Sequence, residues 1–216
     1  FAFVKPRKNL WGRNFSLQSK TGIFNGEIVA GSLLEKESRV IARLMLENLD
    51  EETWRQKLFV ENILQKRSQP TIKRMLALIK KRFATLNPEA WQMVATGSNE
   101  VARHMLLVAA IKHSRLLGDF LIKVIKGNLT AFQNNVTDRD WQKFLEECAT
   151  IEPQIKQWSP STIKKLRQVI FRILAEAKIL ENTRSLKIMP FFINPEVERF
   201  LIKTDESYVL KCLQLQ

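Results

Sequence analysis

Two stretches of the chain carry hydroxyl and basic side chains in an arrangement suited to binding phosphate groups. They span residues 68–83 and 159–174, and they align so that Thr71 of the first matches Thr162 of the second. Lysine and arginine neutralise phosphates, and hydroxyl groups at a helix start can reach phosphates or base edges. The candidate contact residues in and beside them are Arg67, Ser68, Thr71, Lys73, Arg74, Lys80, Lys81, Ser161, Thr162, Lys164, Lys165, Gln168 and Arg172.

The charge distribution favours a polyanionic partner. The chain has 35 Lys and Arg against 22 Asp and Glu, a net charge of +13. Between Glu61 and Glu89, and again between Glu152 and Glu176, there are several basic residues and no acidic one. One basic helix face is often only a solvated surface, whereas two matched runs without acids favour a nucleic acid as partner. The hydroxyl residues at both starts can equally serve as helix caps.

Both stretches are predicted to be amphipathic helices. Each begins with serine and proline, which favour a helix start, and its apolar residues recur at helical spacing. An acid-capped helix with a tryptophan, Trp54 or Trp141, precedes each of them. A short helix through Val60, Ile63 and Leu64 is expected to connect the first pair. This order indicates helix-turn-helix units, although generic three-helix bundles share it.

A small β-hairpin is expected after the second basic helix. Residues 179–180 and 186–188 are apolar segments on either side of a polar turn. Such a hairpin would form a wing and place Arg184 and Lys187 over a phosphate backbone.

The segment 101–124 is apolar on nearly all sides, so it should form the buried core. The predicted fold class is therefore mainly α, with two helix-turn-helix-like units flanking a central apolar helical core and a wing in the C-terminal unit. The corresponding segments are residues 1–96, 97–136 and 137–216. The basic residues 1–26 are interpreted either as an extended arm along phosphates or as a strand or loop packed on the body.

Catalytic and metal-binding chemistry is not indicated. The seven glycines are scattered, and Cys148 and Cys212 have no zinc-type spacing, so the cysteines are interpreted as reduced structural thiols in a cytosolic setting. His104 and His113 are placed on opposite faces of a helix by their spacing. No catalytic residue, metal or cofactor is therefore expected. The longest apolar run in the middle of the chain is too short for a membrane span, which predicts a soluble, cytoplasmic protein with no membrane partner.

A set of short motifs extends from about residue 20 to 205. It includes Glu37-Ser38 before an Ile-Ala-x-Leu helix, Trp54, the string from Asn62 to Arg74, and Thr162-x-x-Lys165 leading into residues 174–180. Together these motifs resemble the BrxA family, a small component of the BREX bacteriophage-exclusion systems, and the string from Asn62 to Arg74 is the most specific of them. The resemblance implies a mainly helical, non-enzymatic DNA-binding protein that acts beside other BREX components in a bacterial cytoplasm.

The C-terminal unit also resembles winged helices in general. In these a small residue, often glycine, precedes the last Ile-Leu pair of the helix end, and here Lys178 stands at that place. This departure puts the geometry of the turn into the predicted hairpin in doubt.

Two functions follow from these features. The first is binding of double-stranded DNA through the basic helix faces, mostly by phosphate contacts. The alternative is an assembly adaptor that docks on acidic surfaces of partner proteins in the defence complex. RNA is less favoured, because the chain has a single tyrosine and no run of aromatic residues interleaved with basic ones for base stacking.

Overall fold

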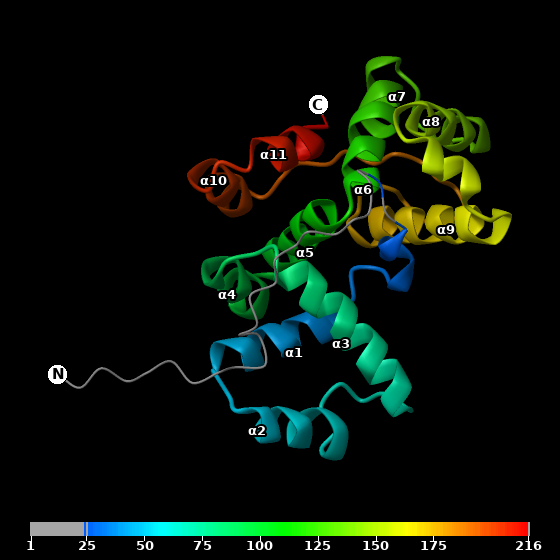
Figure 1. Cartoon of the computed structure of the whole chain (residues 1–216). Coiled ribbons are helices and arrows are strands. Elements are labelled where there is room, and N and C mark those ends of the chain that lie inside the picture. The colour runs from blue at the N-terminus through cyan, green and yellow to red at the C-terminus, as the bar shows by residue number, and fades with distance from the viewer. Residues whose placement is uncertain (1–23, 25, 216) are drawn as a thin grey trace.

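The protein is mainly helical in the computed structural model, which describes residues 24 and 26–215 (Figure 1). The predicted basic arm, residues 1–26, lies outside the described residues except for Phe24 and Gly26. The helical elements are η1 (Glu27–Ala30), α1 (Glu35–Leu46), α2 (Glu51–Arg55), η2 (Gln56–Val60), α3 (Gln69–Phe83), α4 (Pro88–Thr96), α5 (Asn99–His113), α6 (Arg115–Phe120), η3 (Leu121–Lys126), α7 (Gly127–Thr130), α8 (Asp138–Ile151), η4 (Pro153–Gln157), α9 (Pro160–Glu176), α10 (Pro195–Lys203) and α11 (Ser207–Leu213).

The apolar segment predicted as the core forms the centre of the molecule. It consists of α5, α6 and η3, in which almost every residue from Met105 to Ile111 and from Leu116 to Leu121 is inaccessible to solvent. Ser114 interrupts the helix between the two parts. One cluster of buried residues extends from this centre to both ends of the described chain. The division into residues 1–96, 97–136 and 137–216 stays a prediction.

The N-terminal half packs on the lower part of this centre (Figure 1). Helix α1 lies against α4, and α3 lies against α5. The acid-capped helix with Trp54 is confirmed: Asp50 accepts a hydrogen bond from Thr53 N at 2.8 Å, and the helix continues as η2 to Val60.

The predicted short helix through Val60, Ile63 and Leu64 is wrong. Residues 61–68 form an irregular connection in which Asn62 and Gln65 have positive φ angles of 49° and 51°. The Asn62 side chain accepts a hydrogen bond from Lys66 N at 3.0 Å and donates one to Lys66 O at 2.9 Å. An asparagine that bonds the nearby backbone in this way competes with helix formation.

The C-terminal half surrounds an aromatic cluster. Thr137 and Asp140 form a capping box at the start of α8, which directs Trp141 and Phe144 inward. These rings contact Phe120 of α6 and Phe171 of α9 at centroid distances between 5.1 and 6.1 Å. The cluster fixes α8 and α9 to the central helices, while α10 and α11 pack on the other side of the centre, with α11 against α5, α6 and η3 (Figure 1).

The segment predicted as a wing folds back on itself without forming a strand in the part of the chain that the structure describes. Leu180 and Ile188 pair in one antiparallel bridge, and Lys187 pairs with Asn135 in another. Lys178 has a φ angle of 65°, so a lysine occupies the left-handed position at the end of α9. The wing therefore stays a prediction.

Among residues 24 and 26–215, no helix has the length and apolar character required to cross a lipid bilayer.

Candidate nucleic-acid interface

The start of α3 presents cations to solvent. Ser68 and Pro70 begin the helix, and the apolar residues Ile72 and Ile79 anchor it from within. The predicted contact residues Arg67, Ser68, Lys73 and Arg74 are exposed, whereas Thr71 is half-buried and its hydroxyl lies 2.9 Å from that of Ser68. No carboxylate of the described residues lies within 4.0 Å of the charged groups of Arg67, Lys73 or Arg74.

The end of α3 is different, because its cations are used within the protein. Lys80 is half-buried, and this burial lowers its pKa, against the opposing charge of Glu51. Lys81 is exposed but forms an ion pair with Glu27 at 2.8 Å. The structure therefore separates these two predicted contact residues from the unpaired cations at the start of the helix.

The start of α9 resembles that of α3 and has a better cap. Ser159 Oγ accepts a hydrogen bond from Thr162 N at 3.2 Å and lies 2.9 Å from the hydroxyl groups of Ser161 and Thr162. The cap is therefore Ser159, and the hydroxyl groups of Ser161 and Thr162 contact this capping side chain. Ser161 is exposed and Thr162 is half-buried.

The outer face of α9 remains basic from Lys164 to Arg172, over about two turns. Lys164, Lys165, Gln168 and Arg172 are exposed. Within the described residues, none of the three cations among them has a carboxylate within 4.0 Å. Sequence reasoning thus placed the whole basic face of α9 correctly at the surface, although contact with a nucleic acid stays a prediction.

Two arginines in the basic windows are structural. Arg82 of α3 is only 2% exposed, and burial lowers its pKa to about 10. Arg167 of α9 forms an ion pair with Asp138 and lies over the Phe171 ring, with 4.6 Å from the guanidinium carbon to the ring centroid. Counts of charge along the sequence include both, but neither is free to neutralise a phosphate.

The predicted wing residues are exposed at a tight turn. Asn182 Oδ1 accepts hydrogen bonds from Arg184 N at 2.8 Å and Ser185 N at 2.9 Å, which fixes the turn. Arg184 and Lys187 both point to solvent, and the described carboxylates lie beyond ion-pair distance of them.

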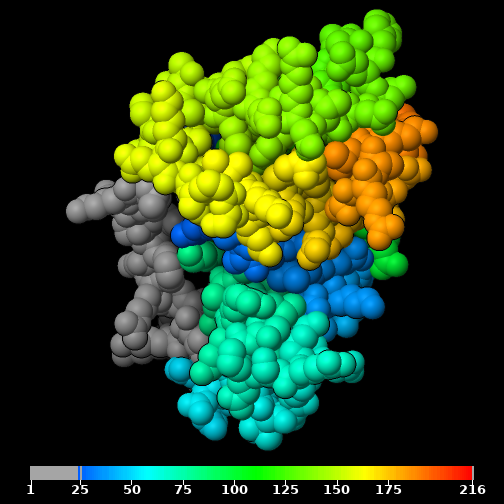
Figure 2. Space-filling view, turned by 90° about the vertical axis from the view of Figure 1, so that its right-hand side faces the viewer, coloured from blue at the N-terminus to red at the C-terminus, as the bar shows by residue number. Residues whose placement is uncertain are grey.

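The two helix starts lie on one side of the molecule. In Figure 1 the first residues of α3 and α9 are both at the right-hand edge. Figure 2 views that side and shows α3 in teal below α9 in yellow, with the orange segment around residues 180–190 beside α9. The starts of α3 and α9 therefore lie on the same side of the molecule, which we call the common face.

A short N-terminal segment connects the two helices. We define the tie segment as residues 24 and 26–34, which lies in blue between α3 and α9 in Figure 2. Its backbone amides at Phe24 and Leu33 donate hydrogen bonds of 2.7 and 2.8 Å to Glu152 and Glu176, the residues at the two ends of the η4–α9 region.

The other side of the tie segment is bonded to α3. Arg82 donates from Nη1 to Ser32 O at 2.5 Å and from Nη2 to Gly31 O at 3.0 Å. Glu27 pairs with Lys81 and also lies 3.2 Å from Nε2 of His113. Ile28 is fully buried in the same place. The tie segment thereby fixes the position of α3 relative to α9.

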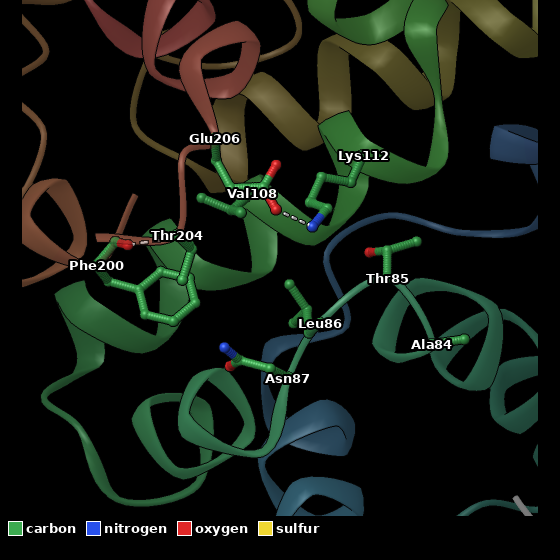
Figure 3. Close-up of a pocket in the computed structure, with 9 residues that line it drawn as sticks. All are labelled: Ala84, Thr85, Leu86, Asn87, Val108, Lys112, Phe200, Thr204 and Glu206. Carbon is green, nitrogen blue, oxygen red and sulfur yellow. Dashed lines mark hydrogen bonds and ion pairs between the residues drawn. The ribbon is translucent and has the colours of Figure 1, made fainter. Parts of the chain in front are cut away.

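The histidines and the polar groups of one pocket have partners within the protein. His104 Nδ1 accepts a hydrogen bond from Asn194 N at 3.1 Å, and no cluster of three metal-ligating side chains occurs within the described residues. The pocket in Figure 3 has a volume of about 240 Å³ and lies where the α3–α4 turn meets α5 and α10. Its Lys112 pairs with Glu206, and its Thr204 hydroxyl donates to Phe200 O at 2.9 Å.

Comparison with known proteins adds independent findings. The family model described as BrxA matches residues 22–205. The BREX protein BrxA of Paramagnetospirillum magneticum (strain ATCC 700264 / AMB-1) is 39% identical over 192 residues, which cover 89% of this chain and 96% of that protein. The BREX protein BrxA of Escherichia coli O9:H4 (strain HS) is 30% identical over 200 residues, covering 93% and 94%.

A solved structure is also similar. The crystal structure of an uncharacterized protein from Magnetospirillum magneticum has 38% sequence identity and a TM-score of 0.81, covering 90% of this chain and all of that one. The mainly helical arrangement described above therefore occurs in an experimentally determined relative.

Proposed function

This chain belongs to the BrxA family, and from that premise we propose that it is a non-enzymatic component of a bacterial BREX phage-defence system that binds double-stranded DNA. The observation that carries the proposal is the common face, on which two helix starts present exposed cations without carboxylate partners. It acts beside other BREX components in the cytoplasm and requires no cofactor.

The proposed binding is mainly electrostatic. Each cation that contacts a phosphate releases counterions from DNA, and this release lowers the observed affinity as salt rises. The contacts are assigned to Arg67, Lys73, Arg74, Lys164, Lys165, Arg172, Arg184 and Lys187. Lys80 and Lys81 contribute less, because burial and the Glu27 ion pair occupy them.

The two basic helices are proposed to act as the recognition helices of helix-turn-helix-like units, with the 182–187 turn as a wing. Ser68, Thr71, Ser161 and Thr162 then supply hydroxyl groups near the helix starts that reach phosphates or base edges, and Gln168 is the polar side chain proposed to approach the bases. Phosphate contacts position such a protein and carry little sequence information, so affinity for random duplex DNA is expected.

The test is a titration of the protein with random duplex DNA at several salt concentrations. Replacing Lys164 and Lys165 by alanine is expected to reduce the slope of log K against log salt by about 2, one unit for each lost phosphate contact. The matched control replaces Arg199 and Lys211, two exposed cations of α10 and α11 away from the common face, and should leave the slope unchanged.

Two outcomes would reject the proposal. Equal losses in both double variants would mean that net charge, and not the common face, determines binding. No retained complex with the unmodified protein at moderate salt would instead favour the adaptor, in which the basic faces dock on acidic protein surfaces.

A further inference from the structure

A second surface of the molecule is apolar and open. A cavity of about 490 Å³ lies between the end of α7 and the segment 187–192, next to Leu215. Its walls are mainly apolar, from Leu129, Ile188, Phe191 and Phe192 among others. The polar groups of the pocket in Figure 3 bond to other groups of the protein. This cavity, in contrast, exposes apolar side chains to water, which is unfavourable unless another molecule covers them.

Phe132 projects from the loop beside this cavity. It follows α7 between two residues that line the hollow, Leu129 and Asn134, and its side chain is 94% exposed. Its φ angle is 56°, in the left-handed region where glycine is favoured at a helix end. The turn is fixed by hydrogen bonds from Phe132 N to Leu129 O and from Gln133 N to Asn128 O, at 3.0 and 2.8 Å.

The loop that holds Phe132 is also braced from behind. The amide of the buried Asn128 donates hydrogen bonds to Asn135 O at 3.0 Å and to Asp140 at 3.3 Å. Asp140 in turn caps α8. A large apolar ring therefore stands in solvent on a firmly bonded turn, where glycine would fit the backbone better.

Phe192 lines the cavity itself. It follows Pro190 in an extended segment, in which Phe191 turns inward against the His104 ring at 4.9 Å and Phe192 turns outward with 66% exposure. Single exposed apolar residues are common, but two phenylalanines beside one apolar hollow have the composition of the centre of a protein interface.

The charges near the cavity identify the kind of partner. Lys187 is the charged residue among those that line it, and Lys126 donates a hydrogen bond of 2.9 Å to Gln214 O next to Leu215. Among the described residues that line the cavity, none carries a carboxylate. A second copy of the chain would bring its own Lys187 and net charge of +13 to this surface, and this like charge opposes self-association.

We propose that the surface formed by Phe132, Phe192 and this cavity docks an acidic segment of another protein, which inserts a bulky apolar side chain into the hollow. The apolar side chain supplies the buried area, and the flanking acids face Lys187 and Lys126. No residue of α3 or α9 lines the cavity, so this proposal does not depend on the DNA contacts of those helices. Of the proposed DNA contacts, only Lys187 also lines the cavity.

The experiment uses fluorescein-labelled hexapeptides with two acidic residues on each side of two apolar ones, in versions with phenylalanine, leucine, methionine or tryptophan as the anchor. A matched peptide set carries lysines in place of the acids. Fluorescence anisotropy with the full chain is expected to show saturable binding of at least one acidic peptide and none of the basic ones. Failure of every acidic peptide to bind would overturn the proposal.

Two variants locate the binding. The double variant Phe132→Ser and Phe192→Ser changes two exposed positions. It should lower the affinity for the acidic peptide at least tenfold and leave the circular dichroism spectrum and the DNA affinity unchanged. Lys164→Ala with Lys165→Ala should leave peptide affinity unchanged. The reverse pattern would place the peptide on the common basic face and overturn the proposal.

Sedimentation equilibrium tests whether a second copy of the chain occupies this surface instead. The protein is expected to show no self-association that depends on Phe132 and Phe192. A dimer that is lost in the Phe132→Ser and Phe192→Ser variant would assign the surface to a second copy of the chain, against the proposal.

Discussion

Helices α3 and α9 have similar sequences but use their basic residues differently. In α9 the cations Lys164, Lys165 and Arg172 are all exposed and unpaired within the described chain. In α3 only the first turns are free, because the last turn packs against the tie segment and α5. The difference arises from the position of each helix: the end of α3 is covered by another segment, while the outer face of α9 is not.

This comparison shows that the number of basic residues in a sequence window overestimates the positive charge exposed on the folded protein. A buried cation must be satisfied by carbonyl groups or carboxylates, as Arg82 is by Gly31 and Ser32. Its charge then contributes to the fold and is not available to a ligand. The following changes test whether the two helices differ in this way.

The largest effect is expected at Arg82. Arg82→Met leaves two part-buried carbonyl acceptors without their charged donor, so the free energy of unfolding should fall by about 3 kcal/mol. Arg167→Met in α9 should cost less than about 1 kcal/mol, because its partner Asp138 is 78% exposed. Urea unfolding followed by circular dichroism measures both, and equal losses would contradict the assigned difference.

The next effect concerns DNA affinity within α3. Lys73→Ala with Arg74→Ala should reduce the salt slope by about 2, which corresponds to roughly 2 kcal/mol of binding free energy at 0.1 M salt. Lys80→Ala with Lys81→Ala removes the same formal charge and should reduce the slope by less than about 1. If both double variants reduced the salt slope equally, the ion pair with Glu27 would not prevent Lys81 from contacting DNA.

A smaller effect is expected at the two helix starts. Ser159 Oγ accepts a backbone hydrogen bond in α9, whereas Ser68 makes no such bond in α3. Ser159→Ala should therefore lower the free energy of unfolding by about 1 kcal/mol, and Ser68→Ala by only a few tenths. Thermal unfolding of both variants provides the comparison, which fails if Ser68→Ala is the more damaging change.

The smallest effect is a pH dependence of the tie segment. Burial, and then the charge of Arg82, lower the pKa of His113, while Glu27 opposes the shift. Below pH 6.5 the unfolded chain therefore binds a proton more readily than the folded one, so stability decreases as pH falls through this region. The hydrogen bond from Lys81 lowers the pKa of Glu27, so its contribution is present above pH 4.5 and is lost as pH falls through its folded pKa.

Melting temperatures measured from pH 7 to pH 4 test this sign. His113→Gln should remove part of the decrease between pH 7 and pH 5, and the remainder comes from His104, whose pKa is also lowered, mainly by burial. If the melting temperature of His113→Gln depended on pH in the same way as that of the unmodified protein, protonation of His113 would not contribute to the loss of stability.

Sequence periodicity predicted α3, α8 and α9 well, because each buries one apolar stripe, and the central helices were predicted because they are apolar on nearly all sides. It missed the irregular connection at residues 61–68, where the bonds of the Asn62 side chain to Lys66 replace helical ones. It also could not show that Arg82 is buried, because its acceptors lie about 50 residues away in the chain.

The tie segment also has a consequence for biosynthesis. Its hydrogen bonds join Phe24 to Glu152 and Leu33 to Glu176, across 128 and 143 positions. A ribosome delivers the N-terminal partners first, and they must wait until most of the polypeptide has emerged before their acceptors exist. Docking of this stretch is therefore a late event in folding, and a nascent chain that stalls before residue 152 would expose the apolar Ile28 to chaperones.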